Sequence, residues 1–263
     1  MFKKLFGKTP PLPSDPVEAA QQAYDALKAQ RGEDDPDTLQ ALFALGQAQI
    51  GLRQFSQAQA TGTRLRDLFI AQSGPDHPNV GYGLDVMASA LTGQGQLADA
   101  IAVREQAITL LENHFGPEHE MTLQRTRLLA VAYAENGDVA KAQSTLAKYM
   151  PAAQAIPPLH AQYMDSHAFV TSLADGPDAA IPILEQLIAF YRDHGQEETS
   201  TFASKLFNLS QLYLDAGRPA DALDASSEAG MTALATYGPD HPAAQEIFAF
   251  QTDLRTRHEA GEF

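Results

Sequence analysis

Three residues with metal-binding side chains lie close together in the sequence: His114, Glu118 and His119. Imidazole and carboxylate groups are ligands for zinc, and a zinc ion with an open position activates water for hydrolysis. Gly116 and Pro117 interrupt the segment, so the three side chains cannot share one helix face. Their spacing also differs from the two-His helical motif of zinc hydrolases. A metal-dependent hydrolase is therefore a remote alternative, and we expect no metal and no other cofactor.

The sequence contains no other recognisable catalytic set. No nucleophile has a base at a familiar spacing, and no Gly-rich phosphate loop follows a strand. His77, His119 and His241 occupy equivalent positions in repeated turns, which indicates a structural role as helix caps or packing groups. His167 stands where an apolar residue is usual, and we expect a hydrogen-bonded interior histidine there. We predict that the protein is not an enzyme.

The strongest pattern is a turn motif that returns after 42 residues. Gly-Pro-Asp-His-Pro stands at 74–78 and again at 238–242, and related turns stand at 32–36 and 116–120. An Ala that follows a second Gly-containing turn recurs with nearly the same period, at Ala58, Ala100, Ala142, Ala180 and Ala222. Such a period indicates stacked units that cannot bury their apolar faces alone.

Each unit reads as two antiparallel helices. Val80, Leu84 and Leu91 recur at helical spacing, the turn at 93–95 ends that helix, and a second apolar stripe follows. We therefore predict a flexible, basic and Pro-rich tail (1–15), one solenoid (16–259) and a short C-terminal tail (260–263). The predicted solenoid consists of an N-terminal cap helix (16–31), five repeats (36–73, 78–115, 120–150, 158–194 and 198–237) and a C-terminal cap helix (242–259). The Pro-rich segment 150–158 is either a hinge or a fixed kink.

The apolar and small residues of one repeat resemble those of the tetratricopeptide repeat (TPR): Leu84, Met87, Ala88, Leu91, Ala100 and Ala107. With the 42-residue period and the Gly-Pro-Asp-His-Pro turn, they resemble the longer variant found in kinesin light chains and many bacterial scaffold proteins. The resemblance implies an all-α, right-handed superhelical solenoid of about twelve helices. It also implies a non-catalytic scaffold or adaptor that binds a peptide segment of a partner protein in its concave groove.

In TPR superhelices the first helix of each pair lines the concave groove. The resemblance places these residues there: Gln40, Phe43, Gln47, Tyr82, Asp85, Ser89, Gln124, Arg127, Gln162, Asp165, Phe169, Ser204, Phe207 and Gln211. Aromatic rings provide area for an apolar anchor, and amide and hydroxyl groups can pair with an extended backbone. The alternative is that Phe43, Phe169 and Phe207 only pack between neighbouring repeats.

The charge of the chain narrows the class of partner. The net charge is −15, and three of the positive charges belong to lysines in the first eight residues, so the rest of the chain is more acidic still. A surface that binds the phosphates of nucleic acid is therefore not expected. TPR proteins that hold a carboxylate use cationic groove residues, but Arg127 is the only cation among the predicted positions. Asp85 and Asp165 instead favour a protein or peptide partner with Lys or Arg.

The remaining expectations concern location and assembly. No apolar stretch is long enough to span a bilayer, so membrane contact is expected, if at all, only through Phe2, Leu5 and Phe6 of the N-terminal tail. The absence of Cys is compatible with a reducing cytoplasm, and we expect a cytoplasmic protein. The protein is either a monomer or a homodimer. A self-associating structural module, with exposed apolar groups near the fourth repeat or the end helices, is the main alternative function.

Overall fold

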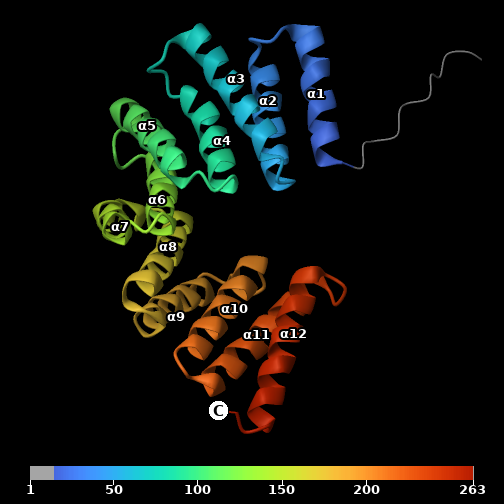
Figure 1. Cartoon of the computed structure of the whole chain (residues 1–263), viewed down its shortest axis with the longest axis vertical. Helices are drawn as coiled ribbons and strands as arrows, with labels where there is room; N and C mark the ends of the chain where they lie inside the picture. Colours follow the sequence, from blue (N-terminus) through green and yellow to red (C-terminus); the bar gives the residue numbers. More distant parts are fainter. Residues whose placement is uncertain (1–14, 263) are drawn as a thin grey trace, which may run out of the picture. The chain divides into compact units, whose positions relative to one another are not determined.

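The computed structural model describes residues 15–262, and these form twelve α-helices with no strand among them (Figure 1). The helices are α1 (Pro16–Arg31), α2 (Pro36–Gly51), α3 (Phe55–Ser73), α4 (Val80–Gly93), α5 (Leu97–Phe115), α6 (Glu120–Glu135), α7 (Val139–Ala153), α8 (Pro157–Asp175), α9 (Pro177–Asp193), α10 (Ser200–Asp215), α11 (Pro219–Tyr237) and α12 (Pro242–Glu259). The predicted all-α fold of about twelve helices is confirmed. The predicted roles of Phe2, Leu5 and Phe6 lie outside the described residues.

The chain divides into two compact units, each with a hydrophobic core of its own. Unit 1 extends to Arg125 and unit 2 begins at Thr126, so the division falls within α6. The core of unit 1 gathers around Leu42, Leu65 and Leu84 from three successive helices. A larger core fills unit 2, and it contains the fully buried Leu187 of α9 and Leu254 of α12. Each core is built from neighbours in the chain, as expected for stacked helix pairs.

The repeated glycines end the second helices in a conformation that other residues rarely adopt. Gly74 has φ 89° and ψ 165°, and Gly238 has φ 81° and ψ 168°. This region of backbone space is essentially restricted to glycine, because a Cβ atom would clash there. The motif therefore stops each helix and turns the chain toward the next pair. Its glycine is a geometric requirement of the turn.

The histidine of each turn caps the start of the helix that follows. The Nδ1 atoms of His77, His119 and His241 each accept a hydrogen bond of 3.2 Å from the main-chain N–H two residues later. Asp35 holds the same position in the first turn and accepts from the N–H of Asp37 at 3.0 Å. Such caps satisfy N–H groups that have no partner within a helix. The predicted structural role, as a cap or a packing group, is confirmed: His241 is the N-cap of α12, and His77 accepts from Asn79, the residue just before α4.

Two of these histidines also pack against aromatic rings. Phe115 stacks on His119 with ring centroids 4.4 Å apart, and Tyr237 stacks on His241 at 4.2 Å. The prediction for His167 is wrong, because its side chain is exposed on α8. A ring that is left in water avoids the cost of burying a polar group without a partner.

Helices α3 and α4, which belong to successive repeats, approach closely where small residues allow it. A Cβ atom on Gly83 of α4 would lie 2.4 Å from the main-chain nitrogen of Arg66 on α3. One on Gly62 would lie 2.9 Å from the carbonyl oxygen of Gly83 and from the main-chain nitrogen of Met87. The backbones of α3 and α4 therefore fit together only because both positions lack a side chain. The contact joins the second helix of one repeat to the first helix of the next.

Replacing Gly83 with Ala should destabilise the protein by about 1–3 kcal/mol, because the added methyl group meets backbone that must shift. The matched control is Gly81→Ala on the same helix, where a Cβ atom has no neighbour within 4 Å. That change should be neutral or stabilise by up to ~1 kcal/mol, since Ala favours helix more than Gly does. Urea denaturation of both variants measures the difference. Equal stabilities would contradict the close packing of α3 and α4.

Replacing His241 with Ala should cost about 1 kcal/mol of unfolding free energy, because the N–H of Ala243 loses its acceptor. In His241→Asp a carboxylate can accept the same hydrogen bond, as Asp35 does in the first turn, and most of the loss should be recovered. Thermal and urea denaturation of the two variants test this. An Asp variant as unstable as the Ala variant would show that the contact with Tyr237, and not the cap, is the main contribution.

Candidate binding surface

The first helices of the pairs, α2, α4, α6, α8 and α10, carry the fourteen residues predicted to line a groove, and none of them is buried. We call this set the first-helix row. Seven members are exposed: Gln40, Gln47, Gln124, Gln162, Phe169, Ser204 and Gln211. The other seven are half-buried: Phe43, Tyr82, Asp85, Ser89, Arg127, Asp165 and Phe207. In the same helices Leu42, Leu84 and Leu206 are buried, so each first helix keeps this row accessible while its other side packs.

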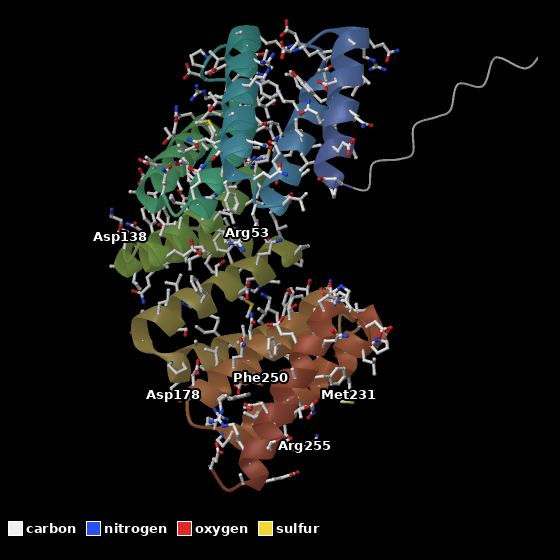
Figure 2. All side chains as sticks on the ribbon, turned by 45° about the vertical axis from the view of Figure 1, so that its right-hand side comes forward. Arg53, Asp138, Asp178, Met231, Phe250 and Arg255 are labelled. Carbon is white, nitrogen blue, oxygen red and sulfur yellow. The ribbon has the colours of Figure 1, made fainter. Side chains whose placement is uncertain are left out.

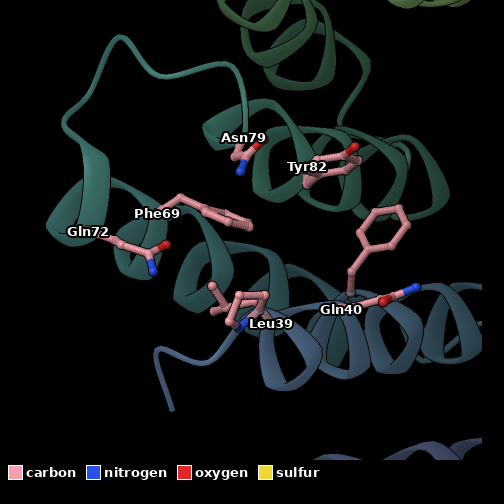
Figure 3. Close-up of a pocket in the computed structure, with 8 residues that line it drawn as sticks. Leu39, Gln40, Phe69, Gln72, Asn79 and Tyr82 are labelled. Atoms are coloured by element: carbon pink, nitrogen blue, oxygen red, sulfur yellow. The ribbon is translucent and has the colours of Figure 1, made fainter. Parts of the chain in front are cut away.

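Three members of the row meet at a pocket in unit 1. Gln40, Phe43 and Tyr82 line a cavity of about 380 Å³ together with residues that the sequence pattern did not single out: Pro36, Leu39, Phe69, Gln72 and Asn79. The ring of Tyr82 meets Phe43 edge-on at 5.3 Å and lies 6.2 Å from Phe69. Figure 3 shows Leu39, Phe69 and Tyr82 around the opening, with Gln40, Gln72 and Asn79 at its edge.

Sequence reasoning missed Phe69 and Gln72 because it assigned the groove to first helices alone. Both residues belong to the last turns of α3, a second helix. The pocket forms where this helix ends beside the starts of α2 and α4. A usable signal was present, since Phe69 and Gln72 precede the turn motif at 74–78 by only a few residues.

The acid of the row in unit 1 already has a cationic partner. Asp85 of α4 accepts hydrogen bonds from the Nε of Arg125 on α6, at 3.1 Å, and from a terminal nitrogen of the same guanidinium. Burial raises the pKa of Asp85, and the charge of Arg125 opposes that shift. A two-point pair of this kind holds Arg125 against α4 within unit 1. It also leaves Asp85 less available to a partner than its sequence position indicated.

Similar side-chain pairs connect successive first helices in unit 2. Asp165 of α8 forms an ion pair with Lys205 of α10 at 2.7 Å. Arg127 of α6 donates to the Oγ of Ser166 at 3.3 Å, and burial lowers the pKa of Arg127. Both acids that were expected to attract a cationic ligand are therefore occupied within the chain. The spacing of 40 residues, from Asp85 to Arg125 and from Asp165 to Lys205, was a signal that the sequence analysis did not use.

The aromatic members of the row differ in how much they pack. Phe207 meets Phe250 of α12 edge-on at 5.2 Å (Figure 2 labels Phe250), which supports a packing role for Phe207. Phe43 likewise contacts Tyr82. Phe169 is different, because its side chain is 40% exposed and a second apolar residue, Leu173, is exposed one turn later on α8. Phe169 is thus the most exposed aromatic member of the row.

A second pocket, of about 370 Å³, lies in unit 2 among the start of α8, the end of α9 and the start of α10. Its lining includes Gln162 of the first-helix row. Phe190 stacks on His194 there at 4.1 Å, and the carbonyl oxygen of Phe190 lies 2.7 Å from the Nδ1 of that histidine. The two pockets are thus built from corresponding parts of two repeats.

Two further features concern metal ligands and the hydropathy of the helices. Across residues 15–262, no three His, Asp or Glu side chains come together as ligands for a metal ion. His114, Glu118 and His119 are exposed, and the ring of His119 is engaged with Phe115. None of the helices in the described part of the chain is long and apolar enough to cross a membrane.

Comparisons with known proteins agree with this architecture. A family model of the tetratricopeptide repeat matches residues 83–155, and no curated protein matches the sequence. BtubC (BKLC) from P. vanneervenii has a similar structure, with a TM-score of 0.68, 15% identity and coverage of 86% of this chain and 92% of that one. Nearly identical TPR-like repeats of a kinesin light chain candidate from Podosopora anserina also have a similar structure. The TM-score is 0.63, the identity is 20%, and the match covers 78% of this chain and 99% of that one. The apo form of RapI matches with a TM-score of 0.60 and 11% identity, over 93% of each chain.

At these identities the likeness concerns the fold. It confirms the predicted all-α solenoid of helix pairs, a fold that this chain shares with TPR-like repeats, and the family model identifies a tetratricopeptide repeat in residues 83–155.

Replacing Arg125 with Met should destabilise the protein by about 2–3 kcal/mol at pH 7, because the half-buried Asp85 loses its hydrogen-bonded counter-charge and keeps only the longer-range charge of Arg104. The loss should shrink as the pH falls toward 4. A carboxyl whose pKa is raised on folding binds a proton more readily in the folded protein, so folding is favoured at low pH and disfavoured as it ionises. Urea denaturation at pH 7 and pH 4.5 measures both effects. A loss of equal size at both values would contradict the pairing.

Proposed function

We propose that this chain of tetratricopeptide-type repeats is a non-catalytic scaffold that binds a segment of a partner protein along the first-helix row. The observation that carries the proposal is that all fourteen row residues stay accessible while adjacent positions of the same helices are buried. A helix face that holds amide, hydroxyl and aromatic groups in the open suits an extended or helical peptide. Because the fold type serves many functions, this surface supports the proposal and the fold alone does not.

The chemistry of the surface favours a protein over a nucleic acid. With a net charge of −15, the chain would repel a phosphate backbone. The internal pairing of Asp85 and Asp165 means that any preference for a basic partner comes from the unpaired acids of the surface and from the overall charge. We place the protein in the cytoplasm, and we assign it no catalytic residue and no cofactor.

A specific observation also favours the second candidate, a homodimer. Exposed apolar residues occur on α8 of the fourth repeat, at Phe169 and Leu173, and on α11, at Met231 and Leu234. Apolar groups that gather on a surface are typical of protein contacts, including contacts between copies of one chain. The two candidates differ in occupant, because the first requires another protein and the second requires only this chain.

Phe169→Ser should abolish or strongly weaken capture of the native partner, because the ring offers exposed apolar area in the first-helix row. The matched control is Met231→Ser on α11, a second helix, where the side chain is 65% exposed (Figure 2). Affinity capture from the native host, read by mass spectrometry, compares the wild-type protein with both variants. Circular dichroism checks that each variant is folded. The free energy of unfolding should change by less than about 1 kcal/mol in each variant.

Equal recovery of every partner by Phe169→Ser and by the wild-type protein would count against the row in unit 2. Light scattering on the same three proteins measures their mass in solution and so distinguishes the homodimer from a scaffold that binds another protein. A wild-type dimer that Phe169→Ser converts to a monomer, with no other protein captured, would favour self-association.

A further inference from the structure

The two pockets of about 380 and 370 Å³ occupy the same place in two different repeats. Six residues that line the unit 1 pocket each have a counterpart that lines the unit 2 pocket and stands 122 residues later in the sequence. Pro36, Gln40 and Phe69 correspond to Pro158, Gln162 and Tyr191. The same offset relates Leu39, Gln72 and Asn79 to Ala161, His194 and Thr201. The fold therefore builds this pocket from a fixed frame: two helix starts and one helix end.

The two pockets differ in the residues added to that frame. In unit 1, Phe43 and Tyr82 complete the lining, and their rings touch. At the corresponding positions unit 2 has Asp165, which is paired with Lys205, and Ser204. The lining of the unit 1 pocket thus contains three aromatic rings, those of Phe43, Phe69 and Tyr82, beside Leu39. Its volume lies in the range of about 300–1,000 Å³ that is usual for sites which enclose a ligand group.

The lining of the unit 1 pocket contains no charged residue, but acids stand beside it. Gln72 at its edge donates to the main-chain carbonyl of Asp34 at 3.1 Å, and Asp76 lies in the turn three residues before Asn79. The side chains of Asp34 and Asp76 are exposed, and neither has an ion-pair partner among residues 15–262. In contrast, the neighbouring Glu33 is engaged by Lys28 and Arg64.

We propose that the unit 1 pocket is an anchor site for one bulky apolar side chain of a partner protein, in an extended segment with Lys or Arg close to the anchor. This inference rests on the proposed function and names the partner's chemistry. The rings of Phe43, Phe69 and Tyr82 receive the anchor, and the amides of Gln40, Gln72 and Asn79 pair with the backbone beside it. Asp34 and Asp76 attract the flanking cations, and they disfavour an acidic segment.

The test uses a synthetic peptide with this chemistry, acetyl-Lys-Lys-Phe-Gly-Lys-amide, titrated into the isotope-labelled full chain. Nuclear magnetic resonance follows the side-chain amides of Gln40, Gln72 and Asn79, which report weak binding directly. These signals should shift in a saturable way, while the amide of Gln162 in the unit 2 pocket should not. A peptide with Ser in place of Phe, or with Glu in place of every Lys, should bind at least about tenfold more weakly.

Two variants connect the binding to the proposed residues. Phe43→Asp/Tyr82→Ser gives the unit 1 pocket the residue types of unit 2 and should weaken the peptide at least about tenfold. Since this change could also affect folding, a surface variant supplements it. Asp34→Asn/Asp76→Asn should weaken the peptide about threefold or more at low salt, with less effect at high salt. Its matched control, Asp178→Asn/Asp240→Asn, removes two exposed acids elsewhere and should bind as the wild-type protein does.

Three outcomes would overturn the proposal: no shift at Gln40, Gln72 and Asn79, equal binding of the Ser peptide, or equal binding of the Glu peptide. Tighter binding after deletion of residues 1–14 would also overturn it. The occupant would then be the chain's own Phe2–Lys8 segment, which has the same chemistry, and not a partner. Each of these failures leaves the proposed function standing if capture through Phe169 persists, because Phe169 lies in unit 2.

Discussion

Each helix pair in this protein can bury its apolar side only against the next pair, and the rest of the structure depends on that constraint. The pairs must therefore approach closely and turn sharply. Gly62 and Gly83 allow the backbones of α3 and α4 to meet, and the glycines of the 42-residue turns supply a conformation that other residues rarely adopt. Three turn histidines each accept a hydrogen bond from one N–H near the start of the next helix.

The same constraint determines which side of the first helices stays open. A helix that packs against its neighbours has few positions left for solvent, and the exposed members of the first-helix row are among them. Side-chain pairs such as Asp85 with Arg125 and Asp165 with Lys205 join one first helix to the next beside that row. In these pairs each acid is already bound to a cation of the chain, so the row offers a partner mainly amides, hydroxyls and aromatic rings. A surface of this kind can hold a protein segment without strong dependence on one ion pair.

Much of the fold could be predicted from the sequence, because turn chemistry and helical spacing are local properties. The repeated turns, the helical spacing of the apolar residues and the resemblance to tetratricopeptide repeats together predicted about twelve helices, and the turns alone predicted a structural role for His77 and its equivalents. Pairings between distant residues were not predictable in this way. Arg125 has no feature that separates it from Arg127 until α4 and α6 are placed, and Phe69 enters the pocket from a helix that was assigned to packing. His167 was misplaced because an equivalent position does not guarantee equivalent burial. That residues 16–259 form one solenoid, and that the row is a groove, remain predictions.

The central claim is that a partner protein lies along the first-helix row. A photo-reactive amino acid introduced at Gln47 of α2 or Gln211 of α10, both exposed in the row, tests it inside the native host. The control positions are Thr109 of α5 and Ala235 of α11, which are exposed on second helices. We predict that light links the same partner protein to the chain from Gln47, from Gln211 or from both, and not from the control positions. Adducts that form only from Thr109 or Ala235 would contradict the account and would place the binding surface on the second helices.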